Sequence, residues 1–164
     1  MPIEIREINE KKDLENSLEV IRVSFQTVAR ELNLTPQNCP SHSSFITFEK
    51  LDDLKKKARL FGLFADDKQI GFVAIEKAGD RLYYLDKLAV LPEQRHRGYG
   101  RKLVEYVLSE VKKAGGSRVS LGMIDNYTVL KEWYKSLGFM ETGTKKFDHL
   151  PFIVCFMDRE LSVQ

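Results

Sequence analysis

The fold of this chain is decided by the stretch Leu88-Ala89-Val90-Leu91-Pro92-Glu93-Gln94-Arg95-His96-Arg97-Gly98-Tyr99-Gly100-Arg101-Lys102. Its apolar start predicts a strand that ends at Pro92, because proline cannot donate to a strand ladder. A helix follows from Gly98, with apolar residues at helical spacing through Val111. A helix N-terminus beside arginines is typical of an anion site, and glycine lets a phosphate approach the backbone. The stretch therefore predicts a cradle for a diphosphate.

Length and composition limit the classes of protein to which the chain can belong. Its 164 residues suffice for one domain, 1–164, and 43% hydrophobic with 30% charged residues is typical of a soluble protein. The net charge of +2 makes nucleic acid and anionic membranes unexpected partners. No apolar run reaches signal-peptide or transmembrane length, which favours a cytoplasmic protein. Cys39 and Cys155 lack metal-ligand spacing, so we expect free thiols and no metal site.

Hydrophobic periodicity predicts an alternation of strands and helices around this stretch. Upstream we expect, in order, a strand at 3–6, a helix over 10–32, a loop over 33–46, a short helix from Thr47, and strands at 59–65, 70–76 and 81–90. Downstream we expect a strand at 119–123, a helix over 128–137, and an antiparallel pair at 139–144 and 151–157. The helical crossover makes the strand at 119–123 parallel to the one before it. This order predicts one mixed α/β (α+β) domain.

Two motifs together resemble the GNAT N-acetyltransferase family. Leu88-Ala89-Val90, Pro92-Glu93 and Arg95-x-x-Gly98-x-Gly100 are similar to the family's acyl-CoA signature, (Gln or Arg)-x-x-Gly-x-(Gly or Ala). Trp133-Tyr134-Lys135-Ser136-Leu137-Gly138-Phe139 resembles its later helix, which ends in Tyr-x-x-x-Gly-Phe. The resemblance is close over 58–140 and loose elsewhere. The loop lacks the Gly-Lys-Ser/Thr of a Walker motif and the Gly-x-Gly-x-x-Gly of a dinucleotide-binding fold.

This resemblance implies a GNAT fold and a donor. The fold is a mixed, mostly antiparallel central sheet flanked by helices, with a splayed parallel strand pair at the cofactor site. The donor and co-substrate is acetyl-CoA or another acyl-CoA, whose pantetheine amides would pair with the strand backbone of Leu88, Ala89 and Val90. The pyrophosphate would be held by loop N–H groups, with charge from one or two basic side chains. The residues concerned are Arg95, His96, Arg97, Gly98, Tyr99, Gly100, Arg101 and Lys102.

Two further residues match the family's motifs. Tyr134 matches the acid that protonates the departing thiolate, a task that suits a phenol within hydrogen-bond reach. Its alternative role is core packing. Asn126 matches an asparagine that often contacts the cofactor, but its spacing to Tyr134 is one residue longer than the common form. Either the loop bulges or Asn126 is only a helix N-cap.

The general base and the acceptor pocket have weaker signals. Strand alternation places Asp86 on the face of Leu88, which makes it the first choice for the base, and Glu76 is the second. Either carboxylate could instead pair with a nearby lysine or arginine. His42 and His149 lie in loops that could line the acceptor pocket, and the alternative for each is a surface histidine.

The sequence therefore predicts an N-acyltransferase in which a primary amine attacks acetyl-CoA directly, in a ternary complex. Neither cysteine has a motif-placed base, which disfavours covalent transfer. A non-catalytic acyl-CoA-binding or sensing domain and an acetyltransferase of protein amines are the alternatives. We favour a small-molecule amine as the acceptor, encoded by the loops 33–46 and 145–150, and a monomer or homodimer.

Overall fold

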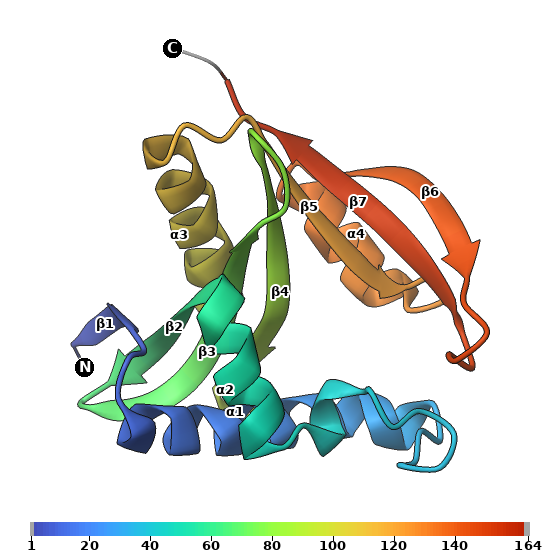
Figure 1. Ribbon diagram of the computed structural model, residues 1–164, viewed down its shortest axis with the longest axis horizontal. Helices are drawn as coiled ribbons and strands as arrows, with labels where there is room; N and C mark the ends of the chain where they lie inside the picture. The colour runs from blue at the N-terminus through green and yellow to red at the C-terminus, as the bar shows by residue number, and fades with distance from the viewer. Residues whose placement is uncertain (1, 163–164) are drawn as a thin grey trace.

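One seven-stranded sheet, in the order β1-β2-β3-β4-β5-β7-β6, forms the centre of the computed structural model, which describes residues 2–162 (Figure 1). The strands are β1 (Ile3–Glu7), β2 (Ala58–Ala65), β3 (Lys68–Lys77), β4 (Leu82–Val90), β5 (Arg118–Ile124), β6 (Met140–Lys146) and β7 (Ile153–Glu160). The α-helices are α1 (Lys11–Glu31), α2 (Phe48–Lys57), α3 (Tyr99–Lys113) and α4 (Thr128–Ser136). Two 3-10 turns, η1 (Ser43–Phe45) and η2 (Pro92–Gln94), lie in the loops before α2 and α3.

Strand directions in the sheet agree with the expected mixed fold. Neighbouring strands are antiparallel except β4 and β5, which are parallel and joined through α3. The mostly antiparallel sheet with one parallel pair is therefore confirmed. The last strand lies later than expected, at Ile153–Glu160 instead of 151–157.

The parallel pair β4–β5 is joined over a short distance only. Its register is Leu82↔Arg118, Tyr83↔Val119 and Tyr84↔Ser120. Beyond these pairs the two strands diverge, while each stays paired to its other neighbour (Figure 1). The second half of β4 therefore turns one backbone edge away from any strand of the sheet, which confirms the splayed pair.

A β-bulge interrupts β4 in this open half. The pairing with β3 runs Phe72↔Ala89 and then Ala74↔Asp86, so two residues of β4 lie opposite the single residue Val73 of β3. Lys87, one of the two, has a φ of 54°, which is uncommon for a residue with a side chain. Side chains do not alternate regularly across a bulge. Our reason for placing Asp86 on the face of Leu88 is therefore wrong, because it assumed a regular strand.

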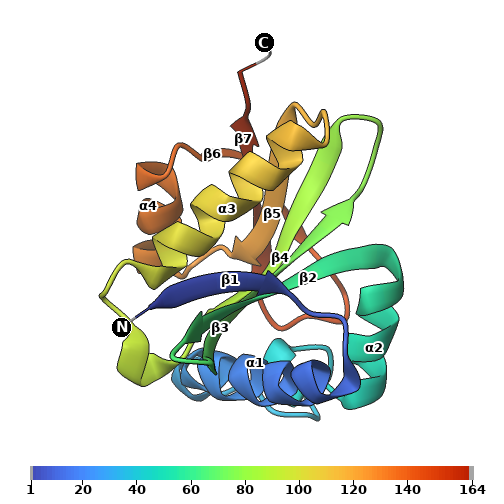
Figure 2. The ribbon, with the colours of Figure 1, turned by 90° about the vertical axis from the view of Figure 1, so that its left-hand side faces the viewer.

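Helices cover both faces of the sheet: α1 and α2 lie on one side and α3 on the other (Figure 2). The expected apolar stripe of α3 is buried, and so are the inner side chains of β2 and β3. The largest fully buried side chains include Phe61, Phe72, Phe139, Ile21 and Leu103. Among the described helices, none combines the length and the apolar character that crossing a membrane requires.

A smaller apolar cluster brings two distant loops together. Leu34 and Cys39, from the segment between α1 and α2, are buried in it, and Leu150 and Phe152 from the β6–β7 connection pack against them. These are the loops in which we expected the acceptor to be encoded. Their contact shows that they belong to one region of the molecule.

Candidate active site

The loop between η2 and α3 has a backbone suited to an anion. His96 and Gly98 both have left-handed φ angles, of 65° and 83°. Gly98 is the N-cap of α3, makes no side-chain cap, and is followed by a first turn without an acidic residue. Left-handed residues among right-handed ones turn successive N–H groups to one side, and the helix dipole adds positive potential there. The backbone can therefore hold a phosphate group without help from a side chain.

The two glycines of the motif have different structural roles. A Cβ on Gly98 would meet nothing within 4 Å, so glycine is needed there for the φ of +83°. A Cβ on Gly100 would lie 3.2 Å from Cζ2 of Trp133, so glycine at this position makes room for the indole on α4. Trp133 is half-buried and packs on the core, as expected. Gly100 therefore sets the packing of α3 against α4, which carries Tyr134.

Arg95 faces inward, unlike the other basic residues of the loop. Its guanidinium donates to the carbonyl oxygen of Val90 at 3.1 Å, to Oγ1 of Thr27 at 3.1 Å and to the carbonyl oxygen of Ser24 at 2.7 Å. We expected a source of charge for the phosphates, but this side chain ties the end of β4 to α1.

The remaining basic side chains stay at the surface. Arg101 forms an ion pair with Glu105 at 2.9 Å along α3. Arg97 and Lys102 are exposed and form no ion pair with another described residue. The guanidinium groups of Arg95 and Arg101 are engaged by other residues, so Arg97 is the better candidate among these arginines to supply charge to a bound phosphate.

Tyr134, the expected proton donor, is buried in α4. Its ring packs edge-to-face against Trp133 at 5.0 Å and Phe139 at 5.6 Å between centroids. Burial raises the pKa of the Tyr134 phenol, and the negative charge of Asp86 raises it further. The phenol is therefore protonated at neutral pH, as an acid must be. The same effect shows that Tyr134 lies within electrostatic range of Asp86.

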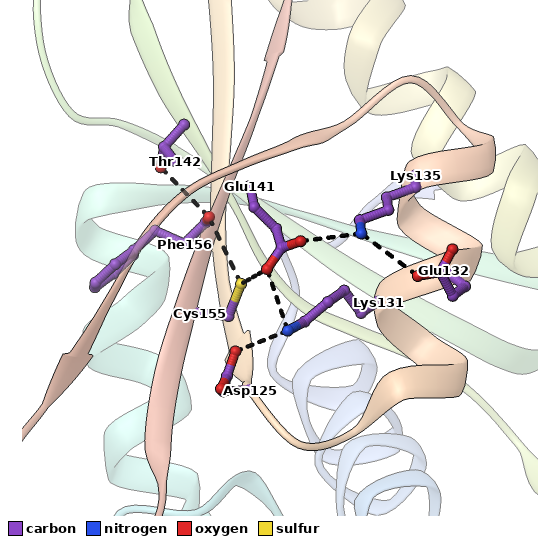
Figure 3. A network of polar contacts seen from close by, with 8 residues as sticks. All are labelled: Asp125, Lys131, Glu132, Lys135, Glu141, Thr142, Cys155 and Phe156. Carbon is purple, nitrogen blue, oxygen red and sulfur yellow. Dashed lines mark hydrogen bonds and ion pairs between the residues drawn. The ribbon is translucent and has the colours of Figure 1, made fainter.

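A charged network holds α4 in place (Figure 3). Lys131 and Lys135, one turn apart on either side of Tyr134, both reach the Glu141 carboxylate of β6, at 3.2 Å and 2.9 Å. Lys131 also contacts Asp125, just after β5, at 2.7 Å. Lys135 and then Lys131 lower the pKa of Glu141 to about 2. The network therefore ties the helix that carries Tyr134 to the end of β5 and to β6.

Side chains of metal-ligating types meet in this network, although their spacing in the sequence does not indicate a metal site. Asp125, Glu141 and Cys155 bring ligand atoms within 4.8 Å of one another, the one such group in residues 2–162. The ammonium of Lys131 contacts both carboxylates. Lys135 contacts Glu141 as well, so two ammonium groups balance the two carboxylates and the group is explained as a salt-bridge network.

Asn126 lies in the turn before α4 and is exposed. The N-cap of α4 is Tyr127, and no side chain caps it. The N-cap alternative for Asn126 is therefore wrong. Its contact with the cofactor stays a prediction.

A cavity of about 270 Å³ lies on the α1–α2 side of the β4 bulge. Its walls come from the loop before α2, from α2 itself and from the bulge, and the polar groups include His42, Lys50, Lys57, Asp86 and Lys87. The structure therefore brings Asp86 to a space that a small molecule could enter. Lys87, which the sequence analysis missed, faces the same space. Nothing in the local sequence marks it, because the bulge arises from pairing with β3.

The structure places the remaining candidates, His42, His149 and Glu76, in different surroundings. His42 is half-buried and lines the cavity, so the surface alternative is wrong for it. Burial, and then the charge of Lys87, lowers the pKa of His42 to about 4. His149 is exposed and packs against Phe147 at 5.7 Å. Glu76, the second choice for a base, forms an ion pair with Lys57 at 3.4 Å.

Comparisons with known proteins identify the family. The sequence profile of the acetyltransferase (GNAT) family matches residues 25–139, which include the anion loop and Tyr134. The chain belongs to this family. No curated protein sequence matches the chain.

Solved structures of the same fold are numerous and distant in sequence. The ribosomal-protein-S18-alanine N-acetyltransferase from Escherichia coli superposes with a TM-score of 0.76 at 18% identity, over 99% of this chain and 96% of that one. The PaiA N-acetyltransferase from Thermoplasma acidophilum, in complex with coenzyme A, gives 0.75 at 21% identity, over 98% and 100%. An aminoglycoside 6′-N-acetyltransferase complexed with coenzyme A gives 0.75 at 18% identity, over 100% and 99%. These likenesses establish the fold.

Proposed function

We propose that the protein is an acetyl-CoA-dependent N-acetyltransferase, in which a primary amine attacks the thioester directly within a ternary complex. One observation carries the proposal: the free edge of β4, which has no partner in β5, leads into the anion loop. The coenzyme A complexes of the PaiA and aminoglycoside enzymes support the choice of donor.

The donor would lie along backbone groups. Leu88, Ala89 and Val90 belong to the half of β4 that has no partner in β5, so backbone groups along this free edge would pair with a ligand whose own amides imitate a strand. The N–H groups from His96 to Arg101 would hold the pyrophosphate, with charge from Arg97. Arg95 would keep the loop in this position through α1.

Two side chains would handle the protons of the transfer. Asp86 would accept a proton from the acceptor amine, so that the neutral nitrogen attacks the thioester carbonyl carbon and a C–N bond forms. As the C–S bond breaks, Tyr134 would donate its phenolic proton to the sulfur, giving a free thiol. The nitrogen of the tetrahedral adduct then loses its second proton, which returns through water to the Tyr134 phenolate, and Asp86 releases the proton that it took to solvent. An ammonium and a thioester thus give an amide, a free thiol and one proton.

Direct transfer agrees with the state of both cysteines. Cys39 and Cys155 are buried, and burial raises the pKa of each thiol. A protonated, buried thiol is a poor nucleophile. We therefore expect no acetylated enzyme in the intact mass when the protein is incubated with acetyl-CoA alone. An acetyl adduct that passes to an added amine would refute direct transfer.

The proposal is tested by coenzyme A release with acetyl-CoA and a panel of primary amines. Tyr134→Phe should lower kcat by about 100-fold or more, because the proton donor is lost while the packed ring remains. Tyr106→Phe is the matched control, since Tyr106 is a half-buried tyrosine of α3 that packs on Phe61 of β2. Equal kcat in Tyr134→Phe and wild type would remove Tyr134 from the mechanism. Acetyl-CoA binding without turnover of any amine would favour a sensing domain.

The acceptor class is the finer part of the proposal. Among the similar structures, one acts on the alanine of a ribosomal protein and another on aminoglycosides, so the fold serves both protein and small-molecule acceptors. The cavity of about 270 Å³ beside Asp86 is of a size for a compact molecule. We therefore propose a small-molecule amine.

A further inference from the structure

A half-buried lysine faces the space beside Asp86 without an acidic partner. Lys87 lines the cavity, and its Nζ donates to Oγ of Ser43 at 3.1 Å, which ties the β4 bulge to η1. Within residues 2–162, Lys87 forms no ion pair. A charged ammonium in a partly desolvated place is stabilised by an anion, and the hydroxyl of Ser43 supplies none.

The other charges of the cavity do not supply that anion. The carboxylate of Asp53 is engaged by Lys56 at 3.3 Å, and Lys57 by Glu76 at 3.4 Å. Lys50 lines the same cavity and has no ion pair among the described residues. The cavity therefore keeps two lysines, Lys50 and Lys87, that form no ion pair with a described residue, and one carboxylate, Asp86, that forms none either.

His42 adds a neutral donor to these cations. Its Nδ1 accepts from the backbone N–H of Ser44 at 3.3 Å and lies 2.7 Å from the Ser44 hydroxyl. A neutral imidazole that accepts at Nδ1 carries its proton on Nε2, so the second ring nitrogen is a donor. Donors from Lys87, Lys50 and His42 therefore line a cavity in which Asp86 is the unpaired carboxylate.

We propose that this cavity binds a small primary amine that also carries an anionic group, with the amine beside Asp86 and the anionic group held by Lys87. The inference rests on the proposed function for the identity of the reacting amine. Polyamines, which carry several positive charges, would meet repulsion from Lys87 and Lys50 and should be poor ligands. The cavity volume of about 270 Å³ suits a compact molecule.

Matched pairs of probes test the anionic group directly. The pairs are glycine, β-alanine, γ-aminobutyrate and 5-aminovalerate against their carboxamides, together with phosphoethanolamine against ethanolamine. The dissociation constant of each is measured by ligand-observed NMR on the full chain saturated with coenzyme A. In at least one pair, the member with the anionic group should bind about tenfold tighter than the member without it. This is the gain expected for a hydrogen bond to a charged group. The absence of such a preference in every pair overturns the inference.

Variants assign the preference to the charge of Lys87. Lys87→Gln should remove it, and Lys87→Arg should restore it. Ser43→Ala removes the hydrogen bond of Lys87 but keeps the charge, so the preference should persist. Lys55→Gln, on α2 outside the cavity wall, is a second control. A preference unchanged in Lys87→Gln overturns the assignment.

The two proposals fail in different ways. Binding that prefers anionic amines, with no coenzyme A release from acetyl-CoA, contradicts the proposed transfer reaction and leaves the anion site standing. Turnover of neutral amides as efficient as that of their anionic partners contradicts the anion site and leaves acetyl transfer standing.

Discussion

The proposed donor and acceptor sides of the free β4 edge are built from different parts of the chain. The donor side uses backbone groups: the open edge of β4, the left-handed residues His96 and Gly98, and the start of α3. The acceptor side uses side chains of Asp86, Lys87 and His42, set in an irregular loop and a bulge.

This difference explains what each side can recognise. Backbone N–H groups are the same in every protein, so a family can keep one donor site while its sequences diverge. Side chains on a bulge and a loop can change without disturbing the sheet. The donor side should therefore respond to changes of backbone conformation, and the acceptor side to changes of charge. Three substitutions test this contrast.

The largest effect is expected from Gly98→Val. Valine strongly disfavours the φ of +83°, so the N–H groups at the start of α3 should leave their positions. Several backbone hydrogen bonds to phosphate would be lost together, and the Kd for coenzyme A should rise by about 100-fold or more. Isothermal titration calorimetry measures this change.

Gly115→Val is the matched control for this substitution. Gly115 has a φ of +85° and open space around its Cβ position, but it lies beyond the other end of α3. Both variants should lose about 1–2 kcal/mol of unfolding free energy, and only Gly98→Val should lose affinity. Equal affinity in the two variants would contradict a donor site made of backbone.

An intermediate effect is expected from Arg95→Ala, and it should appear in stability. Removing the guanidinium leaves the carbonyl oxygens of Ser24 and Val90 without this donor, which costs about 2–3 kcal/mol of unfolding free energy. Arg97→Ala should keep the stability and weaken coenzyme A by up to about tenfold, since its side chain is exposed. Denaturant titration and calorimetry on both variants separate the roles. Loss of affinity at full stability in Arg95→Ala would restore its role as a phosphate ligand.

The smallest effect is expected from His42→Asn, as a change in the pH dependence of stability. The pKa of His42 is about 4 in the folded protein and about 6.5 in the unfolded chain, so unfolding takes up a proton between these pH values. Stability should therefore fall as the pH is lowered from about 7 to about 4, by roughly 1–2 kcal/mol after allowance for solvent screening.

Asparagine keeps an acceptor for the Ser44 N–H and does not titrate, so His42→Asn should have a shallower slope in this pH window. The measurement is urea unfolding at several pH values. An identical slope in wild type and variant would show that His42 is not buried in its neutral form.

The secondary structure of the proposed donor side was largely predictable from the sequence, because its signals are local. A strand that ends at proline, a glycine that starts a helix, and the apolar stripe of that helix all lie within one continuous segment. The family motif and the splayed pair were read from such segments and are confirmed. The inward direction of Arg95 was not predictable, since its partners Thr27 and Ser24 lie far away in the sequence.

The acceptor side was less predictable for physical reasons. The bulge at Lys87 follows from the register between β3 and β4, and no residue type in the strand predicts it. The alternation rule failed at Asp86 for the same reason. His42 has no periodic context, and it is buried by contacts with aromatic rings such as Phe25, at 5.8 Å between centroids. Signals that depend on pairing across the molecule cannot be read from one segment.

The short parallel pairing between β4 and β5 also has a consequence for the order in which the chain folds. β2, β3 and β4 are consecutive antiparallel strands, and β6 and β7 form a second local pair. Such hairpins close short loops and form quickly, whereas a parallel joint must wait for the whole crossover. The β4–β5 pairing, which connects strands β1–β4 to strands β5–β7, consists of three residue pairs, so we expect it to form late. The opening beside β4 would then exist only in molecules that have finished folding.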